Sequence, residues 1–312
     1  MNLVCPKKLI VGDTIALVAP SEPVDKEEVA KIRSYLEGLG YKLKLGKRLF
    51  YKIGDYTAGT IEDRAEDLNG AFSDPEVKAV FMGVGGYAAD QILEQLNFEA
   101  IAKNPKIFVG YSDATTIQQA ILAKTGLVTF HGPNATSLID APAYTLASFW
   151  KVLGGEQIDK VEPFSNWEIL RSGKGKGVLV GGNLDCTSSL LGTRYDPFAA
   201  LKDEKLVLFL EEDRREITDT IRDLFQLKHA GILDRCEGML IGKITEPLPD
   251  VDDYVGVPEL KYILLSMARA YDFPILWGVD FGHIPEKITI PIGVEGEVDT
   301  RTKTFKFKNC LQ

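Results

Sequence analysis

Several kinds of residue are scarce in this chain, and each shortage excludes a class of protein. The 312 residues include only four cysteines and three histidines. The cysteines, Cys5, Cys186, Cys236 and Cys310, form no CxxC pair and no cluster with histidine, so neither a zinc site nor a thioredoxin-like motif is expected. We expect all four to be reduced thiols, as in a cytoplasmic protein.

An excess of basic residues and long hydrophobic runs are also missing. There are 36 Lys and Arg against 45 Asp and Glu, a net charge of −9, which gives no general attraction to nucleic acid or anionic lipid. No apolar run approaches the roughly 18 residues of a membrane-spanning helix, and the first residues lack the apolar stretch of a secretory signal. We therefore expect a cytoplasmic protein with no nucleic-acid or membrane partner.

What is present is typical of a globular α/β protein. Hydrophobic residues make up 45% of the chain and charged residues 26%, and the length suits one large or two ordinary domains. In the first half, β-rich and amphipathic segments alternate, which favours a parallel sheet covered on both faces. Strands are expected at 14–20, 41–46, 77–83, 106–110 and 127–132, and helices at 26–39, 61–74, 88–96, 114–126 and 145–155.

The pattern changes between residues 150 and 175. A polar, irregular stretch follows the last of these helices, so we predict a Rossmann-like domain over 1–160 and a smaller mixed α/β, β-rich domain over 161–312. In the second domain, strands are expected at 176–182, 205–211, 237–244, 288–293 and 294–307, and a helix at 217–231.

The clearest chemical feature is Ser112. A buried strand ends at Gly110 and a helix begins about three residues later, so the hydroxyl lies in the turn, at the positive end of the helix. This is the arrangement of a nucleophile elbow, although Ala114 stands where the usual GxSxG motif has its second glycine. The alternative, which the segment alone favours, is that Ser112 only caps the helix.

A serine nucleophile needs a base and a carboxylate that orients it. His131 and His283 both follow strands in loops, where α/β sites gather, and the residues alone do not choose between them; either could instead have a structural hydrogen-bonding role. His229 lies late in a helix and is expected to be solvated or to interact with the helix dipole.

The candidate carboxylate is Glu211, the first acid after the apolar strand at 205–211. It is expected to be partly buried and to have a donor partner, because an unpaired buried carboxylate is costly. Glu212 and Asp213 fit better as a solvated acidic loop before the next helix.

The segment from Gly83 to Ala88 satisfies GxGxxA, a weak dinucleotide-binding signal. The acidic residue expected about 20 positions later is missing. The loop could instead expose backbone N–H groups to an oxyanion beside Ser112, or simply form a tight turn. We rank the turn with an oxyanion role above the cofactor role.

Taken together, the sequence resembles the LD-carboxypeptidase family of serine peptidases, which includes the microcin C immunity peptidases. The resemblance covers nearly the whole chain. It is carried by GDTIALVAPS (12–21), 58–80, GGYAAD (85–90), NPKIFVGYSDAT (104–115), 126–134, 175–184, LGTRYDP (191–197), LFLEED (208–213) and FGHIPEKITIPIG (281–293).

The resemblance implies a role for each candidate. Ser112 matches the nucleophile of the family, Glu211 the orienting acid and His283 the base, which leaves His131 as a structural or pocket-lining residue. The backbone N–H groups of Gly86 and Asp113 match the oxyanion hole.

The family usually has an arginine before its glycine turn and continues GGYG, where this chain has Val84 and Ala88. The family fold is a Rossmann-like domain with the nucleophile and a C-terminal domain with Glu and His, usually as a homodimer. No metal or cofactor is implied.

The implied substrate is a small peptide: a cytoplasmic murein tetrapeptide that loses its terminal D-alanine in cell-wall recycling. The alternative within the family is a microcin-immunity-type peptidase that hydrolyses aminoacyl-nucleotide or acyl-sulfamoyl conjugates. Outside enzymes, a nucleotide- or peptide-binding module would use the glycine loop without chemistry.

Overall fold

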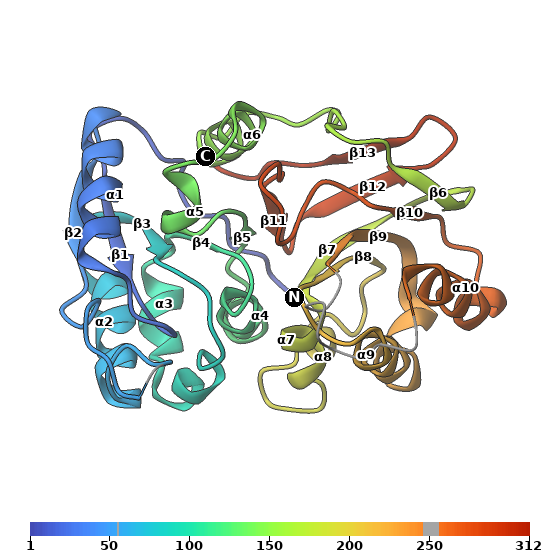
Figure 1. Cartoon of the computed structure of the whole chain (residues 1–312), viewed down its shortest axis with the longest axis horizontal. Helices are drawn as coiled ribbons and strands as arrows, with labels where there is room; N and C mark the ends of the chain where they lie inside the picture. Colours follow the sequence, from blue (N-terminus) through green and yellow to red (C-terminus); the bar gives the residue numbers. More distant parts are fainter. Residues whose placement is uncertain (55, 246–255) are drawn as a thin grey trace.

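Two β-sheets organise the chain, one built mainly from each half (Figure 1). The structure is a computed structural model and describes residues 1–54, 56–245 and 256–312. The strand order of the first sheet is β11-β5-β4-β3-β1-β2, parallel except for β11. Its strands are β1 (Thr14–Val18), β2 (Lys42–Leu45), β3 (Val77–Met82), β4 (Ile107–Gly110), β5 (Thr129–His131) and β11 (Ile290–Ile292).

Helices follow the strands of the first sheet, as the alternating sequence pattern predicts. The capping box expected before the first helix is present, with Asp25 at its N-cap and Glu28 at its third position. The helices are α1 (Lys26–Gly38), α2 (Ile61–Ser73), the 3₁₀ helix η1 (Asp90–Gln95), α3 (Phe98–Lys103), α4 (Ala114–Thr125), α5 (Ala135–Leu138) and α6 (Ala143–Leu153).

The second sheet is mixed, with the order β13-β12-β7-β8-β9-β10-β6. Its four central strands, β7 to β10, are parallel, and antiparallel strands flank them. The strands are β6 (Glu168–Arg171), β7 (Lys174–Asn183), β8 (Leu206–Glu212), β9 (Cys236–Ile244), β10 (Ile275–Trp277), β12 (Glu295–Asp299) and β13 (Thr304–Phe307). The helices are α7 (Leu184–Ser189), α8 (Pro197–Ala200), α9 (Ile217–His229), η2 (Ile232–Arg235), α10 (Val257–Met267) and η3 (Ala268–Ala270).

The two-part α/β fold predicted from the sequence is confirmed, with local differences. The predicted single strand at 294–307 is a hairpin, because the chain turns between β12 and β13 and the two pair with each other. The predicted helix at 88–96 is a short 3₁₀ helix. Strand β11 belongs to the C-terminal half of the sequence yet pairs with β5, so the chain crosses back to the first sheet near its end.

The expectation of four reduced thiols is wrong. Cys5 and Cys310 form a disulfide between residues 305 positions apart, with Cα atoms 5.8 Å from each other. The spacing of cysteines in a sequence does not reveal this pairing, because folding alone brings the two ends together. Cys186 and Cys236 are free.

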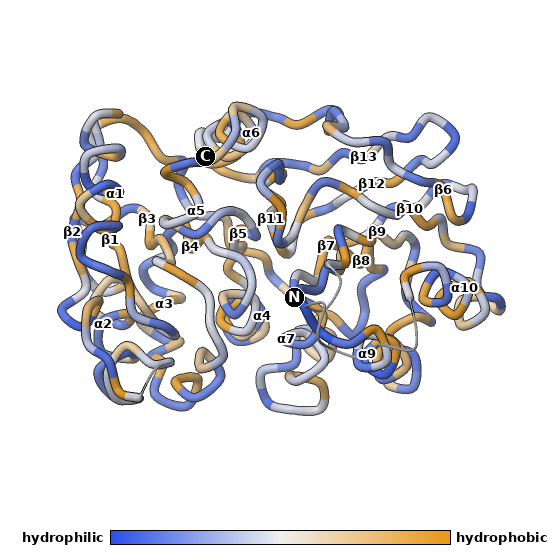
Figure 2. Tube along the Cα trace, viewed as in Figure 1, coloured by the Kyte–Doolittle hydropathy of each residue, from blue (hydrophilic) through white to orange (hydrophobic). Residues whose placement is uncertain are grey.

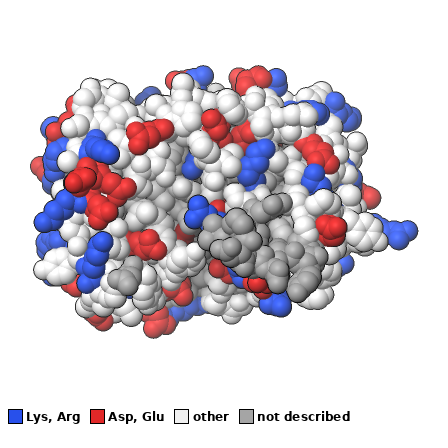
Figure 3. All heavy atoms as spheres, viewed as in Figure 1, with Lys and Arg blue, Asp and Glu red and all other residues white. Residues whose placement is uncertain are grey.

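Hydrophobic residues are frequent along the strands (Figure 2), and the buried ones form two core clusters. On the face in Figure 3, Lys and Arg are interspersed with Asp and Glu. No helix among the described residues is long and apolar enough to cross a membrane. In the same part of the chain, no three His, Cys, Asp or Glu side chains are grouped so as to hold a metal ion.

Candidate active site

Ser112 lies in a strained turn at the carboxyl end of β4. Its φ of +64° is in the left-handed region, which non-glycine residues rarely adopt and which marks functional turns. Asp113, not Ser112, is the N-cap of α4, and the Ser112 hydroxyl makes no capping hydrogen bond with any described residue. The interpretation of Ser112 as a simple helix cap is therefore wrong, and the turn has the strand-to-helix form of a nucleophile elbow.

The glycine loop lies directly against this serine. It follows β3, the parallel neighbour of β4, so both segments leave the same edge of the sheet. A Cβ added at Gly85 would lie 3.0 Å from both Cβ and Oγ of Ser112, so a larger residue there would crowd the hydroxyl. Gly86 has a φ of +136°, a conformation that favours glycine. Among the described residues, the backbone N–H groups of Gly86 and Asp113 find no hydrogen-bond acceptor.

The carboxylate of Asp113 fixes the end of the glycine loop through hydrogen bonds. Its Oδ2 accepts hydrogen bonds from the backbone N–H groups of Ala88 (2.8 Å) and Ala89 (2.9 Å) and from the Ser21 hydroxyl. Burial raises the pKa of this carboxyl. The N–H groups of Ala88 and Ala89 are thus already occupied within the protein, which favours the turn over the cofactor role for this loop.

Glu211 and His283 meet at the carboxyl end of β8, the central strand of the second sheet. Glu211 is fully buried at the end of β8, and its Oε2 lies 2.7 Å from Nδ1 of His283. A Cβ at Gly282 would lie 2.8 Å from the same carboxylate oxygen, and the φ of Gly282 is +103°, so glycine is needed for this approach. Burial raises the pKa of Glu211, but its interactions with His283 outweigh burial and the net shift is downward.

His283 is held from several sides. Its pKa is lowered by burial but raised more by Glu211, through charge and a hydrogen bond, and by Asp213, so that the net shift is upward. Oδ2 of Asp213 lies 3.9 Å from Nε2, the nitrogen not engaged by Glu211. The Tyr111 ring packs edge-on against the imidazole, with ring centroids 4.9 Å apart.

One cavity unites these groups from both halves of the chain. Ser112, Gly86 and Asp113 line it from the first sheet, and His283 and Asp213 line it from the second. Glu211 is behind His283, out of the cavity. The structure thus brings together the side chains that the resemblance singled out.

Glu212 does not fit the expectation of a solvated loop. It is 2% exposed, because β8 continues one residue beyond its predicted end. Its carboxylate accepts hydrogen bonds from Asn183 Nδ2 (3.0 Å) and from the backbone N–H groups of Asp185 (3.0 Å) and Asp213 (3.1 Å). Burial, together with the neighbouring Glu211, raises its pKa to about 7. Asp213 also departs from the expectation, since it faces the cavity.

His131 is buried away from the cavity. It is 1% exposed, and neither ring nitrogen has a hydrogen-bond partner among the described residues. The rings of Tyr111, Phe209 and Phe281 pack around it. Burial lowers its pKa to about 4, so the imidazole is neutral. The structure supports neither a hydrogen-bonding nor a pocket-lining role for His131.

Lys287 is a buried group near the site that the sequence did not indicate. Its Nζ lies 3.9 Å from the centroid of the Tyr111 ring, the same ring that packs on His283. Burial lowers its pKa to about 8. No local sequence signal could have identified it, because Tyr111 is more than 170 residues away along the chain.

The chain matches known proteins over almost its full length. Residues 15–132 match the model of the LD-carboxypeptidase N-terminal domain, and residues 176–298 match that of the LD-carboxypeptidase C-terminal domain. A probable murein peptide carboxypeptidase of Bacillus subtilis is 37% identical over 96% of this chain and 92% of its own. The microcin C7 self-immunity protein MccF of Escherichia coli is 31% identical over 95% of this chain and 93% of its own.

Solved structures agree with the sequence matches. The crystal structure of an MccF-like protein from Bacillus anthracis superimposes with a TM-score of 0.87 and 28% identity, over 98% of this chain and 99% of that one. Together with the two domain matches and the cavity between the sheets, this likeness identifies the chain as a peptidase of the LD-carboxypeptidase family.

Proposed function

We propose that this peptidase is a serine carboxypeptidase in which Ser112 is the nucleophile, His283 the base and Glu211 the acid that orients it. The observation that carries the proposal is the pairing of His283 Nδ1 with the buried Glu211 at 2.7 Å, because His283 lines the same cavity as the strained Ser112. Engagement of Nδ1 by Glu211 leaves Nε2 of the imidazole for the serine.

In the first half of the reaction, His283 Nε2 takes the proton from Ser112 as Oγ attacks the scissile carbonyl carbon. The tetrahedral intermediate collapses when His283 returns that proton to the departing amine, which leaves an acyl-enzyme on Ser112. In the second half, water attacks the ester with His283 again acting as the base, and Ser112 is regenerated. Glu211 stabilises the imidazolium that forms twice in the cycle.

The N–H groups of Gly86 and Asp113 are the proposed oxyanion hole. Both belong to residues that line the same cavity as Ser112, and both are without an acceptor among the described residues. Each such donor typically contributes about 3 kcal/mol to transition-state stabilisation. The Asp113 carboxylate serves the same end indirectly, because it fixes the loop that contains Gly86.

The proposed substrate is a murein tetrapeptide. The enzyme would cleave the bond between the L-centre of the diamino acid and the terminal D-alanine, and so release that D-alanine. The similarity to the murein peptide carboxypeptidase of Bacillus subtilis supports this choice. Incubation of the pure protein with such a tetrapeptide should yield the tripeptide and free D-alanine, detected by mass. Absence of both products would contradict the substrate.

Hydrolysis of aminoacyl-nucleotide or acyl-sulfamoyl conjugates is the second candidate. One observation favours it: Tyr87 lines the cavity and is 82% exposed, so that a flat aromatic ring is available for a base to stack on. The similarity to the self-immunity protein supports it as well. A processed-microcin analogue in a parallel incubation distinguishes the two, because only the preferred substrate should be consumed at low enzyme concentration.

A binding module without chemistry is separated from both by a covalent probe. A fluorophosphonate should add one adduct to the wild-type protein and none to Ser112→Ala, as measured by intact mass. A wild-type protein that stays unmodified would exclude Ser112 as a nucleophile.

A further inference from the structure

A carboxypeptidase must recognise the terminal carboxylate of its substrate, and a cation in the cavity is the group suited to do so. In the described part of the chain, the cavity is lined by two arginines, Arg214 and Arg215, and by no lysine. The choice between them follows from what each guanidinium already binds.

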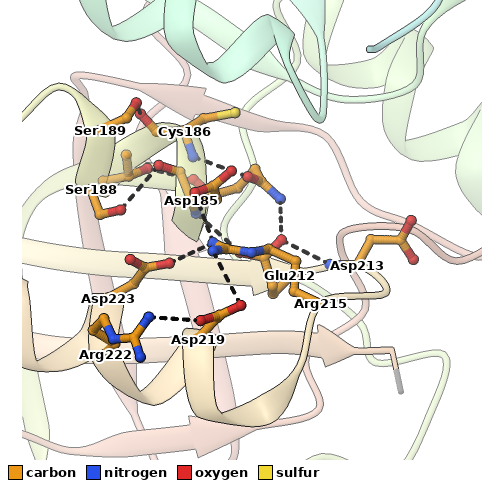
Figure 4. A network of polar contacts seen from close by, with 12 residues as sticks. Asp185, Cys186, Ser188, Ser189, Glu212, Asp213, Arg215, Asp219, Arg222 and Asp223 are labelled. Carbon is orange, nitrogen blue, oxygen red and sulfur yellow. Dashed lines mark hydrogen bonds and ion pairs between the residues drawn. The ribbon is translucent and has the colours of Figure 1, made fainter. Parts of the chain in front are cut away.

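Arg215 is fully committed to protein carboxylates (Figure 4). Its Nη1 lies 2.7 Å from both Asp185 Oδ1 and Asp223 Oδ2, and its other contacts are Glu212 at 3.9 Å and Asp219 at 3.8 Å. A substrate carboxylate that approached Arg215 would have to displace these acids and would be repelled by them. Arg215 therefore serves to hold α7, α9 and the end of β8 together.

Arg214 is bound much more loosely. Among the described residues its one ionic neighbour is Asp213, whose Oδ2 is 3.9 Å from the Arg214 Nε, and its side chain is 68% exposed. The backbone holds it in a specific conformation: φ is +55°, and the Arg214 N–H donates to the Thr245 hydroxyl at 3.0 Å. A non-glycine residue in the left-handed region at the edge of a cavity is typical of a functional position.

The position of Arg214 also fits the geometry of the reaction. Oδ2 of Asp213 lies 3.9 Å both from His283 Nε2 and from Arg214 Nε, so one carboxylate adjoins Arg214 and the imidazole nitrogen that returns the proton to the leaving amine. In the departing residue, the carboxyl carbon is only two bonds, about 2.5 Å, from that amine nitrogen. The carboxylate must therefore lie close to His283 and to Asp213, where a cation is needed to offset the repulsion between the two acids. In Figure 4, the Asp213 carboxylate points away from Arg215 and the acids that bind it.

We infer that Arg214 binds the free α-carboxylate of the departing C-terminal residue and makes the enzyme specific for carboxyl-terminal substrates. This inference rests on the proposed function and adds to it a specificity-determining residue. Arg214 does not take part in proton transfer, so its contribution is to binding and should appear mainly in KM.

The test compares two substrates with the wild-type enzyme and two variants. The substrates are a murein tetrapeptide that ends in D-alanine and the same peptide that ends in D-alanine amide. Arg214→Gln should raise KM for the free acid about 10- to 100-fold with little change in kcat, and should leave the amide unaffected. Arg214→Lys should recover part of the loss, because a lysine keeps the charge but not the planar fork.

Arg222→Gln is the matched control. Arg222 is 78% exposed on α9, pairs with Asp219 at 3.0 Å and does not line the cavity, so this variant should behave as the wild type does on both substrates. The rate at which a small fluorophosphonate labels Ser112 should be the same in Arg214→Gln as in the wild type, which shows that the variant is folded and its nucleophile intact.

Two results would overturn the inference: an unchanged KM of Arg214→Gln for the free acid, or an equal loss on acid and amide. If the wild type cleaves neither peptide, the proposed function itself fails and the assignment of Arg214 falls with it.

Discussion

Asp213 Oδ2 lies 3.9 Å from Nε2 of His283, while Glu211 Oε2 lies 2.7 Å from Nδ1 of the same ring. The imidazole thus has a carboxylate near each of its nitrogens. Burial works against protonation, but the two acids outweigh it and hold the pKa of His283 above its ordinary value of 6.5.

This pair of carboxylates predicts the acid limb of the pH profile. A general base works only when neutral, so kcat/KM should rise with pH through a pKa above 6.5. Asp213→Asn removes one of the two charges that raise the pKa of His283 and should therefore move this limb to lower pH. The measurement is kcat/KM from pH 5 to 9 for both proteins, and a limb that stays in place or moves upward would contradict the assignment.

Ser112→Ala should abolish turnover and leave the fold intact. The loss should be at least about a thousandfold, because the covalent step needs the hydroxyl. Product masses from the tetrapeptide report activity, and the thermal midpoint reports folding. Hydrolysis near the wild-type rate would remove Ser112 from the mechanism.

His283→Ala should lose more activity than His131→Ala. His283 contacts Glu211 and lines the cavity, so its loss should cost about a thousandfold or more in kcat/KM. His131→Ala leaves a hole among aromatic rings and should mainly lower stability, by about 2 kcal/mol, with a smaller loss of activity. Parallel kinetics and denaturant unfolding test this, and the reverse order of activities would show that the base is misassigned.

Glu212 should make stability depend on pH. Its pKa is raised from 4.5 to about 7 in the folded protein, chiefly by burial. The folded state therefore binds the proton more tightly than the unfolded state, and this stabilisation is complete below pH 4.5 and is lost as pH rises through about 7. Glutamine does not titrate, so the thermal midpoint of Glu212→Gln should fall less than that of the wild type between pH 4.5 and pH 7. An identical slope in both proteins would contradict the raised pKa.

The disulfide between Cys5 and Cys310 predicts a redox-dependent stability. Without reductant, alkylation in denaturant should label two cysteines, Cys186 and Cys236, and after reduction it should label four. Reduction should lower the free energy of unfolding by about 4 kcal/mol, since the bond closes nearly the whole chain into one loop. Cys5→Ser should match the reduced wild type and show no further response to reductant. Four labelled thiols in the untreated protein would show that the bond does not form.

Much of the fold follows from local pattern. Buried β-rich runs that end in glycine or proline predict strands, and the capping box at Asp25 predicts the start of α1, because both depend on residues only a few positions apart. The same reasoning places Ser112 and Glu211 at strand ends. That reasoning also predicts one strand where the structure has β12 and β13, because the alternation of residues continues through both and only their pairing reveals the turn.

The sequence alone determines that this is an α/β protein with acidic balance, a serine in a strand-to-helix turn and an acid at the end of an apolar strand. The tertiary structure decides that a histidine meets that acid, that Glu212 is buried and that Cys5 reaches Cys310. It also decides that, among the described residues, four acids surround Arg215 while Arg214 has only Asp213 near it. These four facts depend on side chains from separate loops and strands that only the packing of the two sheets brings within a few ångströms of each other.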